Sequence, residues 1–268
     1  MVLNSFKHKL RKLLNDNCYK NAISIAAATS NREAFSDIKN INAGKEVAIC
    51  GGGLTLTQYK PIDKCLHIAL NRALLNKTIS YDWFVADDWE GIDFIQDELI
   101  AFSGLKFLGH HINLYGDYGR QIPESFSIKC NARRFYTDSY MISNGYESRM
   151  VCDIDRMAIG NMANIAMTAM QIALFTNPAT IYLVGCDASQ GHFIQTSNLT
   201  EARIATHEAD LAMAVSGKNS RVRDMWDDIK RFAMAFYPDT KIVSVNPVGL
   251  KGIFEDIYQN GYQAVSYL

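Results

Sequence analysis

Three consecutive glycines, Gly51–Gly53, are the first residues in this sequence whose type and position suggest chemistry. They directly follow the apolar run Glu46–Cys50, and Thr55 lies just beyond them. Glycine lets a backbone approach a ligand closely, and free amides near the start of a helix suit phosphate. Leu56 stands where a dinucleotide fingerprint needs its third glycine, and no P-loop lysine follows. We therefore expect a nucleotide phosphate to be held here, by Gly51, Gly52, Gly53 and Thr55; the alternative is a tight turn that binds nothing.

Two adjacent carboxylates, Asp87 and Asp88, follow another apolar run, and Asp187 follows a third. Oxygen ligands suit magnesium or manganese, so paired acids in this position could hold a divalent cation. An acid directly after a strand can instead cap the next helix. We expect one of the pair to cap and the other to face the site. We favour a site without metal, with Asp87 and Asp88 as the alternative metal ligands.

Histidines and arginines supply candidates for proton transfer and anion binding. His110-His111 ends one apolar run, His192 lies shortly after Asp187, and His207 lies in the polar stretch beyond. Imidazole titrates near neutral pH and is a natural general base, although a loop histidine is as often simply hydrogen-bonded to backbone. Arg133 and Arg134 could clamp an anionic substrate through paired hydrogen bonds.

The elements that would position these residues alternate between short apolar runs and helical patterns. This alternation predicts an α/β fold, a Rossmann-like doubly wound and mostly parallel sheet. In such sheets ligands bind at the carboxyl ends of the strands, where the Gly, Asn, Asp and His residues of this sequence fall. The predicted strands are 46–50, 65–70, 83–86, 105–108, 180–184 and 241–245, and the clearest predicted helices are 161–175, 221–236 and 253–259.

The predicted organisation is a helical extension over residues 1–44 and one nucleotide-binding domain over residues 45–268. Residues 113–155 are rich in Tyr, Arg, Asp and Ser, and we expect an irregular insert there. Residues 188–219 are polar and are the expected lid. Basic and apolar residues alternate near the start of the chain, which predicts an amphipathic helix that packs on the body or touches an anionic membrane surface.

Composition narrows the class of protein. The chain has 268 residues, 48% of them hydrophobic and 21% charged, so it can bury a sizeable core. A formal net charge of −1 argues against bulk attraction to nucleic acid. Six cysteines without a C-x-x-C pair indicate reduced thiols. We expect a cytoplasmic protein that does not bind nucleic acid. Contact with the inner face of the membrane through the basic helix, and a homo-oligomer, are left open.

Several of these motifs occur in one known group of proteins. The segment Val47-Ala-Ile-Cys-Gly-Gly-Gly-Leu-Thr55 resembles the opening of the small bacterial CMP-sialic-acid-dependent sialyltransferases. Motility accessory factors and archaeal hydroxymethylpterin pyrophosphokinases share this opening in a related domain. Asn71 and Asp87 match the residues that end the next two strands in those families. Ile181–Asp187 and Val245-Asn-Pro247 match two later motifs.

The resemblance implies a glycosyltransferase A-like sheet with a lid. It implies metal-independent transfer of a sugar, such as a sialic acid, from a CMP-sugar to the acceptor of a surface glycan. Asn71 and Asp87 would hold the ribose or base, and Asn161 or Asn164 the sugar or phosphate. The family's lid histidine has no counterpart in Ser216–Asn219, so His192 is the first choice for general base.

His207 and Asp187 are the other catalytic candidates. Two alternative functions remain open at this point. One is a pterin pyrophosphokinase-like transferase that uses ATP and magnesium, with Asp87, Asp88 and Asp187 as metal ligands. The other is a nucleotide-binding protein that has this fold without catalysis.

Overall fold

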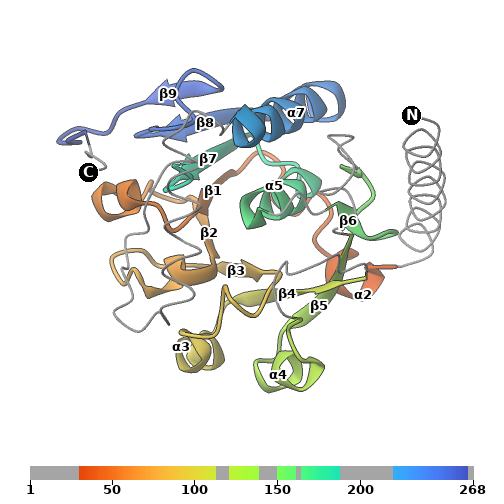
Figure 1. The fold of residues 1–268 in the computed structure, drawn as a ribbon. Helices are drawn as coiled ribbons and strands as arrows, with labels where there is room; N and C mark the ends of the chain where they lie inside the picture. Colours follow the sequence, from red (N-terminus) through yellow and green to blue (C-terminus); the bar gives the residue numbers. More distant parts are fainter. Residues whose placement is uncertain (1–29, 113–120, 139–149, 161–163, 188–219, 265–268) are drawn as a thin grey trace, which may run out of the picture.

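The computed structural model describes residues 30–112, 121–138, 150–160, 164–187 and 220–264. Within these ranges the chain forms one nine-stranded sheet in which every pairing is parallel (Figure 1). The strand order is β6-β5-β4-β3-β2-β1-β7-β8-β9. The strands are β1 (Glu46–Cys50), β2 (Leu66–Leu70), β3 (Trp83–Ala86), β4 (Leu105–His111), β5 (Arg133–Asp138), β6 (Ile159–Gly160), β7 (Thr180–Val184), β8 (Lys241–Val245) and β9 (Glu255–Ile257).

The order of the strands reverses beside β1. From β1 the chain adds strands outward to β6, and it then returns to place β7 on the other side of β1. This is a doubly wound arrangement, and the prediction of a parallel, Rossmann-like α/β sheet is confirmed. The point where the winding reverses, between β1 and β7, is called the switch point below.

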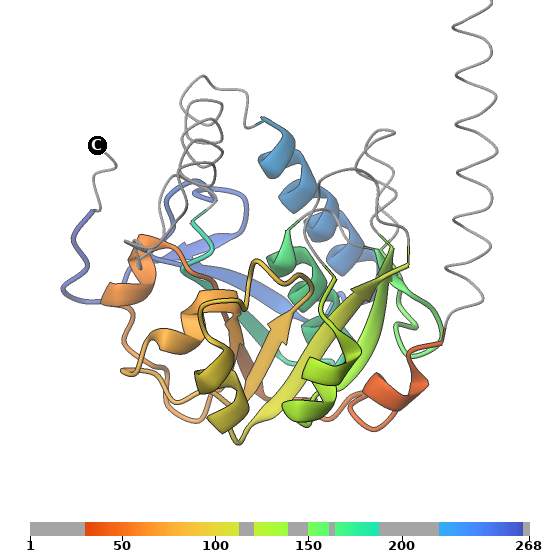
Figure 2. The same cartoon turned by 60° about the horizontal axis from the view of Figure 1, so that its bottom comes forward.

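Helices cover both faces of the sheet (Figure 2). One face carries α2 (Arg32–Phe35), α5 (Ile165–Phe175) and α7 (Ser220–Phe236), whose apolar side chains share a core with Val47, Ile68 and Phe107. The other face carries α3 (Gln96–Ala101), α4 (Glu124–Lys129) and the 3₁₀ turns η1 (Leu54–Gln58) and η2 (Asn71–Leu75), which share a second core with Ala69 and Phe84. A parallel sheet covered on both faces explains why its strands are continuous apolar runs.

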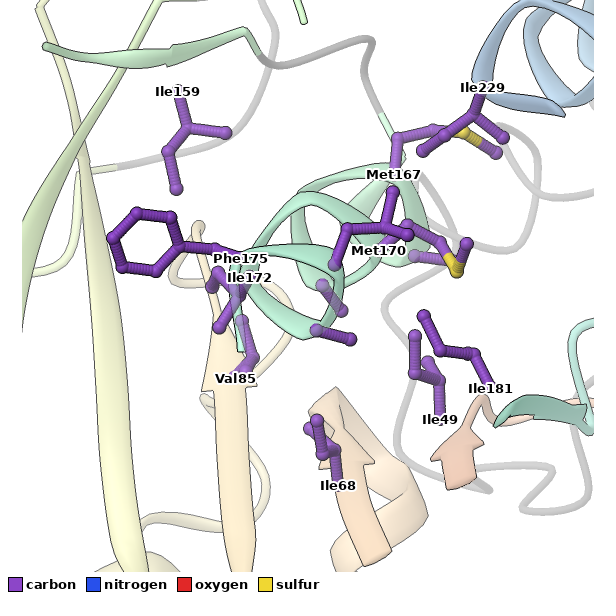
Figure 3. Packing of buried hydrophobic residues seen from close by; sticks show 14 of the residues in the cluster. Ile49, Ile68, Val85, Ile159, Met167, Met170, Ile172, Phe175, Ile181 and Ile229 are labelled. Atoms are coloured by element: carbon purple, nitrogen blue, oxygen red, sulfur yellow. The ribbon is translucent and has the colours of Figure 1, made fainter. Parts of the chain in front are cut away.

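Helix α5 lies at the centre of the first core. Its residues from Ala166 to Phe175 are all buried. Met167 and Met170 lie close to Ile229 of α7, and Ile172 and Phe175 lie nearer to Val85 and Ile159 (Figure 3). A helix that is apolar all round is expected to be buried all round. This central position fixes the amino end of α5 relative to the carboxyl ends of the strands.

The described part of the predicted extension, residues 30–44, packs into the same core. Asn31 is 2% exposed, and its side chain pairs with β5: its Oδ1 accepts from Tyr136 N at 2.7 Å, and its Nδ2 donates to Tyr136 O at 3.2 Å. Its Nδ2 also donates to Met157 O at 3.0 Å. Phe35 packs against the rings of Phe107 and Phe135. The chain that precedes β1 is therefore anchored across β4 and β5.

The tail after β9 is tied to the segment after β1. Gln259 Nε2 donates to Lys60 O at 2.7 Å, and its Oε1 accepts from Lys60 N at 2.8 Å. The Gln58 side chain makes a similar pair of hydrogen bonds with the backbone of Gln263, at 3.0 Å and 2.8 Å. These two pairs join the end of the described chain to η1 across β7 and β8.

Two sequence predictions need correction. Residues 113–155 were expected to be irregular, but they contain α4 and β5. Strand β5 lies inside the sheet, but its first residues, Arg133-Arg134, are charged, and the sequence therefore lacks the apolar run expected of such a strand. Residues 253–259 were predicted to be helical, but Glu255–Ile257 form the edge strand β9, paired with β8. The five cysteines in the described ranges are free thiols, as expected.

Candidate functional site

The carboxyl ends of all nine strands meet at one edge of the sheet, and the predicted site residues in the described ranges can be located against it. Register places Cys50 beside Val184 and Val184 beside Val245, so the turns after β1, β7 and β8 are neighbours. Ala86 lies beside Leu108, so Asp87 follows β3 next to Gly109 of β4. The edge thus has a glycine-rich part at the switch point and an acidic part at β3.

The backbone amides of the glycine turn are largely occupied. Gly51 N donates to Val184 O and Gly53 N donates to Gly185 O, each at 2.8 Å. Thr55 N donates to Asp187 Oδ2 at 3.1 Å, and the Thr55 hydroxyl donates to Asp187 Oδ1. These groups therefore bond within the protein, and phosphate binding by this turn stays a prediction. Among the described residues, only the Gly52 amide of Gly51–Gly53 lacks an acceptor.

Close contact between β1 and β7 explains why glycines occur here. A Cβ on Gly51 would lie 2.6 Å from Gly185 O, and one on Gly53 would lie 2.3 Å from Asp187 Oδ2. Gly185 itself has φ +59°, a conformation that glycine adopts without strain. The glycines let the turn after β1 and the turn after β7 run side by side.

Asp187 has a structural role in this contact. It is 5% exposed, its carboxylate accepts both bonds from Thr55, and its carbonyl accepts from Gly249 N at 2.7 Å. It therefore links the turn after β7 to η1 and to the turn after β8. Its carboxylate is directed to Thr55 and not to Asp87 or Asp88, with which it was grouped as an alternative metal ligand.

Asp87 is the most perturbed acid at this edge. It is 3% exposed, and its Oδ2 accepts a hydrogen bond from Thr168 Oγ1 at 3.1 Å. Thr168 lies in the first turn of α5, which begins at Ile165 after its cap, Asn164. Burial first, and the nearby charge of Asp88 second, raise the pKa of Asp87 to about 7. A carboxyl that titrates near neutral pH can both take up and release a proton under physiological conditions.

Asp88 caps the turn that follows β3. Its Oδ1 accepts from Gly91 N at 2.6 Å, so one of the two acids caps a turn, as expected. That the other faces the site stays a prediction. Burial raises the pKa of Asp88, and the charge of Arg72 opposes that change. In the part of the chain that the structure describes, no group of three or more His, Cys, Asp or Glu residues lies together as a metal site would require.

His111 is buried beside Asp87. Its Nδ1 lies 2.8 Å from Thr137 Oγ1, and its ring lies near the backbone of Asp87. Burial lowers the pKa of His111 to about 4. A neutral ring held by two neighbours positions backbone and does not exchange protons near pH 7.

His110 and the two arginines form contacts within β4, β5 and their helices. Arg134 donates to His110 Nδ1 at 2.6 Å and pairs with Glu124 at 3.2 Å. Arg133 begins β5 at the amino edge of the sheet, where it binds Asp37 and the carbonyl of Ala34. Of the two arginines predicted to clamp an anion, Arg133 therefore lies at the opposite edge of the sheet from Asp87, and Arg134 is engaged in an ion pair.

Asn71 and Asn164, which the sequence marks as binding residues, and the strand-end residue Asn246 have backbone roles. Asn71 and Asn246 have φ +49° and +52°, and asparagine tolerates this left-handed conformation better than most residues. Asn164 Oδ1 accepts from Ala166 N at 3.0 Å and caps α5. Two side-chain atoms nevertheless lack a partner within the described ranges and are buried: Asn71 Oδ1 and Asn246 Nδ2.

Thr168, the partner of Asp87, is the residue of this edge that sequence reasoning missed. It lies four residues after the cap Asn164, on the first turn of a helix that begins at the carboxyl edge. Its distance from a predictable cap is the sequence feature that could have placed it at this edge. Asn161, His192 and His207 lie outside the described residues, as does the basic segment near residue 1. No described helix is long and apolar enough to span a membrane.

Comparison with protein-family models, with curated proteins and with solved structures finds nothing that matches this chain.

Proposed function

We propose that this protein is a glycosyltransferase that binds a nucleotide sugar at the carboxyl edge of its sheet, across the switch point between β1 and β7. The observation that carries the proposal is the topology. Doubly wound parallel sheets bind their ligands outside the carboxyl ends of the strands, where the winding reverses. Here that position lies between Gly51–Gly53 and Gly185.

The contacts at the edge refine how the donor would be held. Since Gly51, Gly53 and Thr55 bond to the turn after β7, the Gly52 amide is the donor left for a phosphate oxygen. Asn246 Nδ2, a buried amide without a partner in the described ranges, is a second hydrogen-bond donor beside the switch point. A cytidine donor follows from the sequence resemblance.

The acidic part of the edge would face the sugar and the acceptor. Asn71 Oδ1, two strands away from β7, and Asp87, three strands away, provide hydrogen-bond acceptors. Hydroxyl groups are donors that such oxygens can bind. The proposal therefore places the nucleotide phosphate at β1, β7 and β8, and the transferred sugar toward β2 and β3.

Thermal shift with nucleotides tests the binding. CMP, CDP, UDP, GDP and ATP are added separately to the full chain, with and without Mg²⁺. A ligand at 100 times its Kd stabilises the native state by about 2.7 kcal/mol, a readily measured rise in Tm. A shift with cytidine nucleotides alone supports the proposal. A shift with ATP that needs Mg²⁺ and disappears with EDTA supports a pyrophosphokinase-like transferase instead, and no shift with any nucleotide overturns nucleotide binding.

Donor hydrolysis tests the chemistry. Incubation with a CMP-sugar should release CMP slowly in water and faster when a glycan acceptor is present. Binding of cytidine nucleotides without release of CMP under either condition would show a nucleotide-binding protein without transferase activity.

A further inference from the structure

We propose that Asp87 is the catalytic base of the transfer, the group that takes the proton from the acceptor hydroxyl. The inference rests on the proposed function and deepens it. It moves the role from the histidines that the sequence pattern suggested to a buried carboxyl at the end of β3.

The position of Asp87 is set by three elements. It follows β3 directly, its Oδ2 accepts from Thr168 in the first turn of α5, and its Cβ packs against Gly109 of β4. A Cβ on Gly109 would lie 2.7 Å from the Cβ of Asp87, so the glycine lets the Cβ of Asp87 approach β4 closely. The side chain is thus fixed at the carboxyl edge by contacts from both sides.

His111 holds the backbone of the same residue. Thr137 of β5 contacts His111 Nδ1 at 2.8 Å, and the imidazole lies in turn near the Asp87 backbone. This relay of Thr137, His111 and Asp87 spans three adjacent strands. These residues contact the backbone of Asp87 and not its carboxylate. A catalytic group needs such support from neighbouring residues.

The other titratable groups at this edge differ from Asp87 in their partners. The Asp187 carboxylate receives both bonds from Thr55, and Asp88 receives the amide of Gly91. His110 Nδ1 receives a bond from Arg134, and His111 is buried with its Nδ1 in contact with Thr137 Oγ1. Asp138 ends β5, two strands away from β3.

The chemistry of the step balances with Asp87 as base. The acceptor oxygen forms a bond to the anomeric carbon, and its proton passes to the Asp87 carboxylate. The bond between the anomeric carbon and the phosphate oxygen breaks, and its electron pair leaves with the nucleotide. Asp87 then returns the proton to water. Burial raises the pKa of Asp87 to about 7, which places the ionised and protonated forms in comparable amounts near neutral pH.

The first test is the isosteric variant Asp87→Asn, with Asp63→Asn as the matched control. Asp63 is an exposed acid at the amino edge of the sheet, before β2. Asp87→Asn should lower kcat for transfer by about 100-fold or more, the range measured for loss of a general base. Its thermal shift with cytidine nucleotide should remain, and Asp63→Asn should match the native protein in both measurements.

The second test uses the pH profile, which a merely structural residue would not move. In the native protein kcat should rise with pH through about 7. Thr168→Val removes the hydrogen bond that lowers the pKa of Asp87, so the rise should move to higher pH, while Thr168→Ser should restore it. Asp88→Asn removes a neighbouring negative charge, so the rise should move to lower pH.

The outcomes separate the two proposals. If the native protein transfers sugar and Asp87→Asn transfers equally well, Asp87 is not the base and the proposed function stands. If Thr168→Val and Asp88→Asn leave the pH profile in place, the assignment also fails. If the native protein neither responds to nucleotides nor releases CMP, the proposed function falls and takes this inference with it.

Discussion

Two buried ionisable residues, Asp87 and His111, lie next to each other at the carboxyl edge, and burial drives the pKa of each toward its neutral form. The pKa of Asp87 rises to about 7, and that of His111 falls to about 4. Neutral forms are favoured because a buried charge loses its hydration. The two residues therefore make opposite contributions to the pH dependence of stability.

Asp87 should destabilise the native state above neutral pH. Its pKa is higher in the folded than in the unfolded chain, so its contribution to stability is complete below about pH 4 and is lost as the pH rises to about 7. Each pKa unit corresponds to about 1.4 kcal/mol, so Asp87→Asn should be more stable than the native protein at pH 8 by up to about 4 kcal/mol. Urea unfolding at pH 8 and pH 4 measures this. Equal stability at both pH values would contradict the burial of a charged Asp87.

His111 should act in the other direction. Its pKa is lower in the folded chain, so its contribution is complete above about pH 6.5 and is lost as the pH falls toward about 4. The loss should reach about 3 kcal/mol, and His111→Gln should remove the part of the pH dependence between pH 6.5 and 4. Urea midpoints over this range, compared with the native protein, give the answer. An unchanged slope in the variant would mean that another group controls acid unfolding.

The residues at the strand ends show how far the sequence could be read at this scale. It correctly marked Asn71, Asp87, Asp187 and Asn246 as residues of one edge. It could not distinguish residues that bind from residues that turn the chain, because asparagine and glycine do both. The positive φ of Asn71, Gly185 and Asn246, and the bonds between Thr55 and Asp187, depend on how β1, β7 and β8 approach each other.

The contact between the turns after β1 and β7 is the main structural consequence of Gly51–Gly53 at the scale of elements. Gly53→Ala would place a Cβ 2.6 Å from the carbonyl oxygen of Gly185 and closer still to Asp187. The two turns would have to separate, and overpacking of this kind costs about 1–3 kcal/mol. We expect a lower urea midpoint and weaker nucleotide response. A variant with native stability would show that the turns are not held in contact.

Element boundaries were predictable where the apolar pattern was strong. The bounds of β1, β3, β7 and β8 agree with the predicted ranges, and α7 begins one residue before its prediction. Strand β5 was missed because Arg133, Arg134 and Asp138 interrupt its apolar pattern, although its Phe135 is fully buried. Strand β9 was mistaken for a helix because Glu255-Asp256-Ile257 has too few residues to show a period of two.

The whole molecule is held together by contacts between distant parts of the sequence, and none of these could be predicted from local pattern. The strand order on either side of β1 and the docking of Asn31 on β5 are of this kind. So is the tie between the tail and the segment after β1, which joins residues about 200 positions apart. The alternation of strands and helices predicted the class of fold but not these contacts between distant segments.

The hydrogen bonds of the tail offer a test of whether such a distant contact stabilises the molecule. Gln259→Ala removes both hydrogen bonds to the Lys60 backbone and should cost about 1 kcal/mol, the net worth of such bonds at an exposed position. Gln263→Ala is the matched control, because Gln263 contributes only backbone atoms to its pair with Gln58. Amide hydrogen exchange should rise around Lys60 in the first variant and stay native in the second. Native protection in both would mean that the tail does not restrain η1.

The common direction of the nine strands has a practical consequence for attaching the protein to a surface or a dye. Turns at the amino edge, such as those of Lys64 and Asp239, are exposed and lie at the opposite end of the strands from Gly52 and Asp87. A tether placed at Lys64 or Asp239 would leave the other edge turned toward the solution. Immobilised in this way, the molecule would present its carboxyl edge, the proposed nucleotide site, uniformly to the solution.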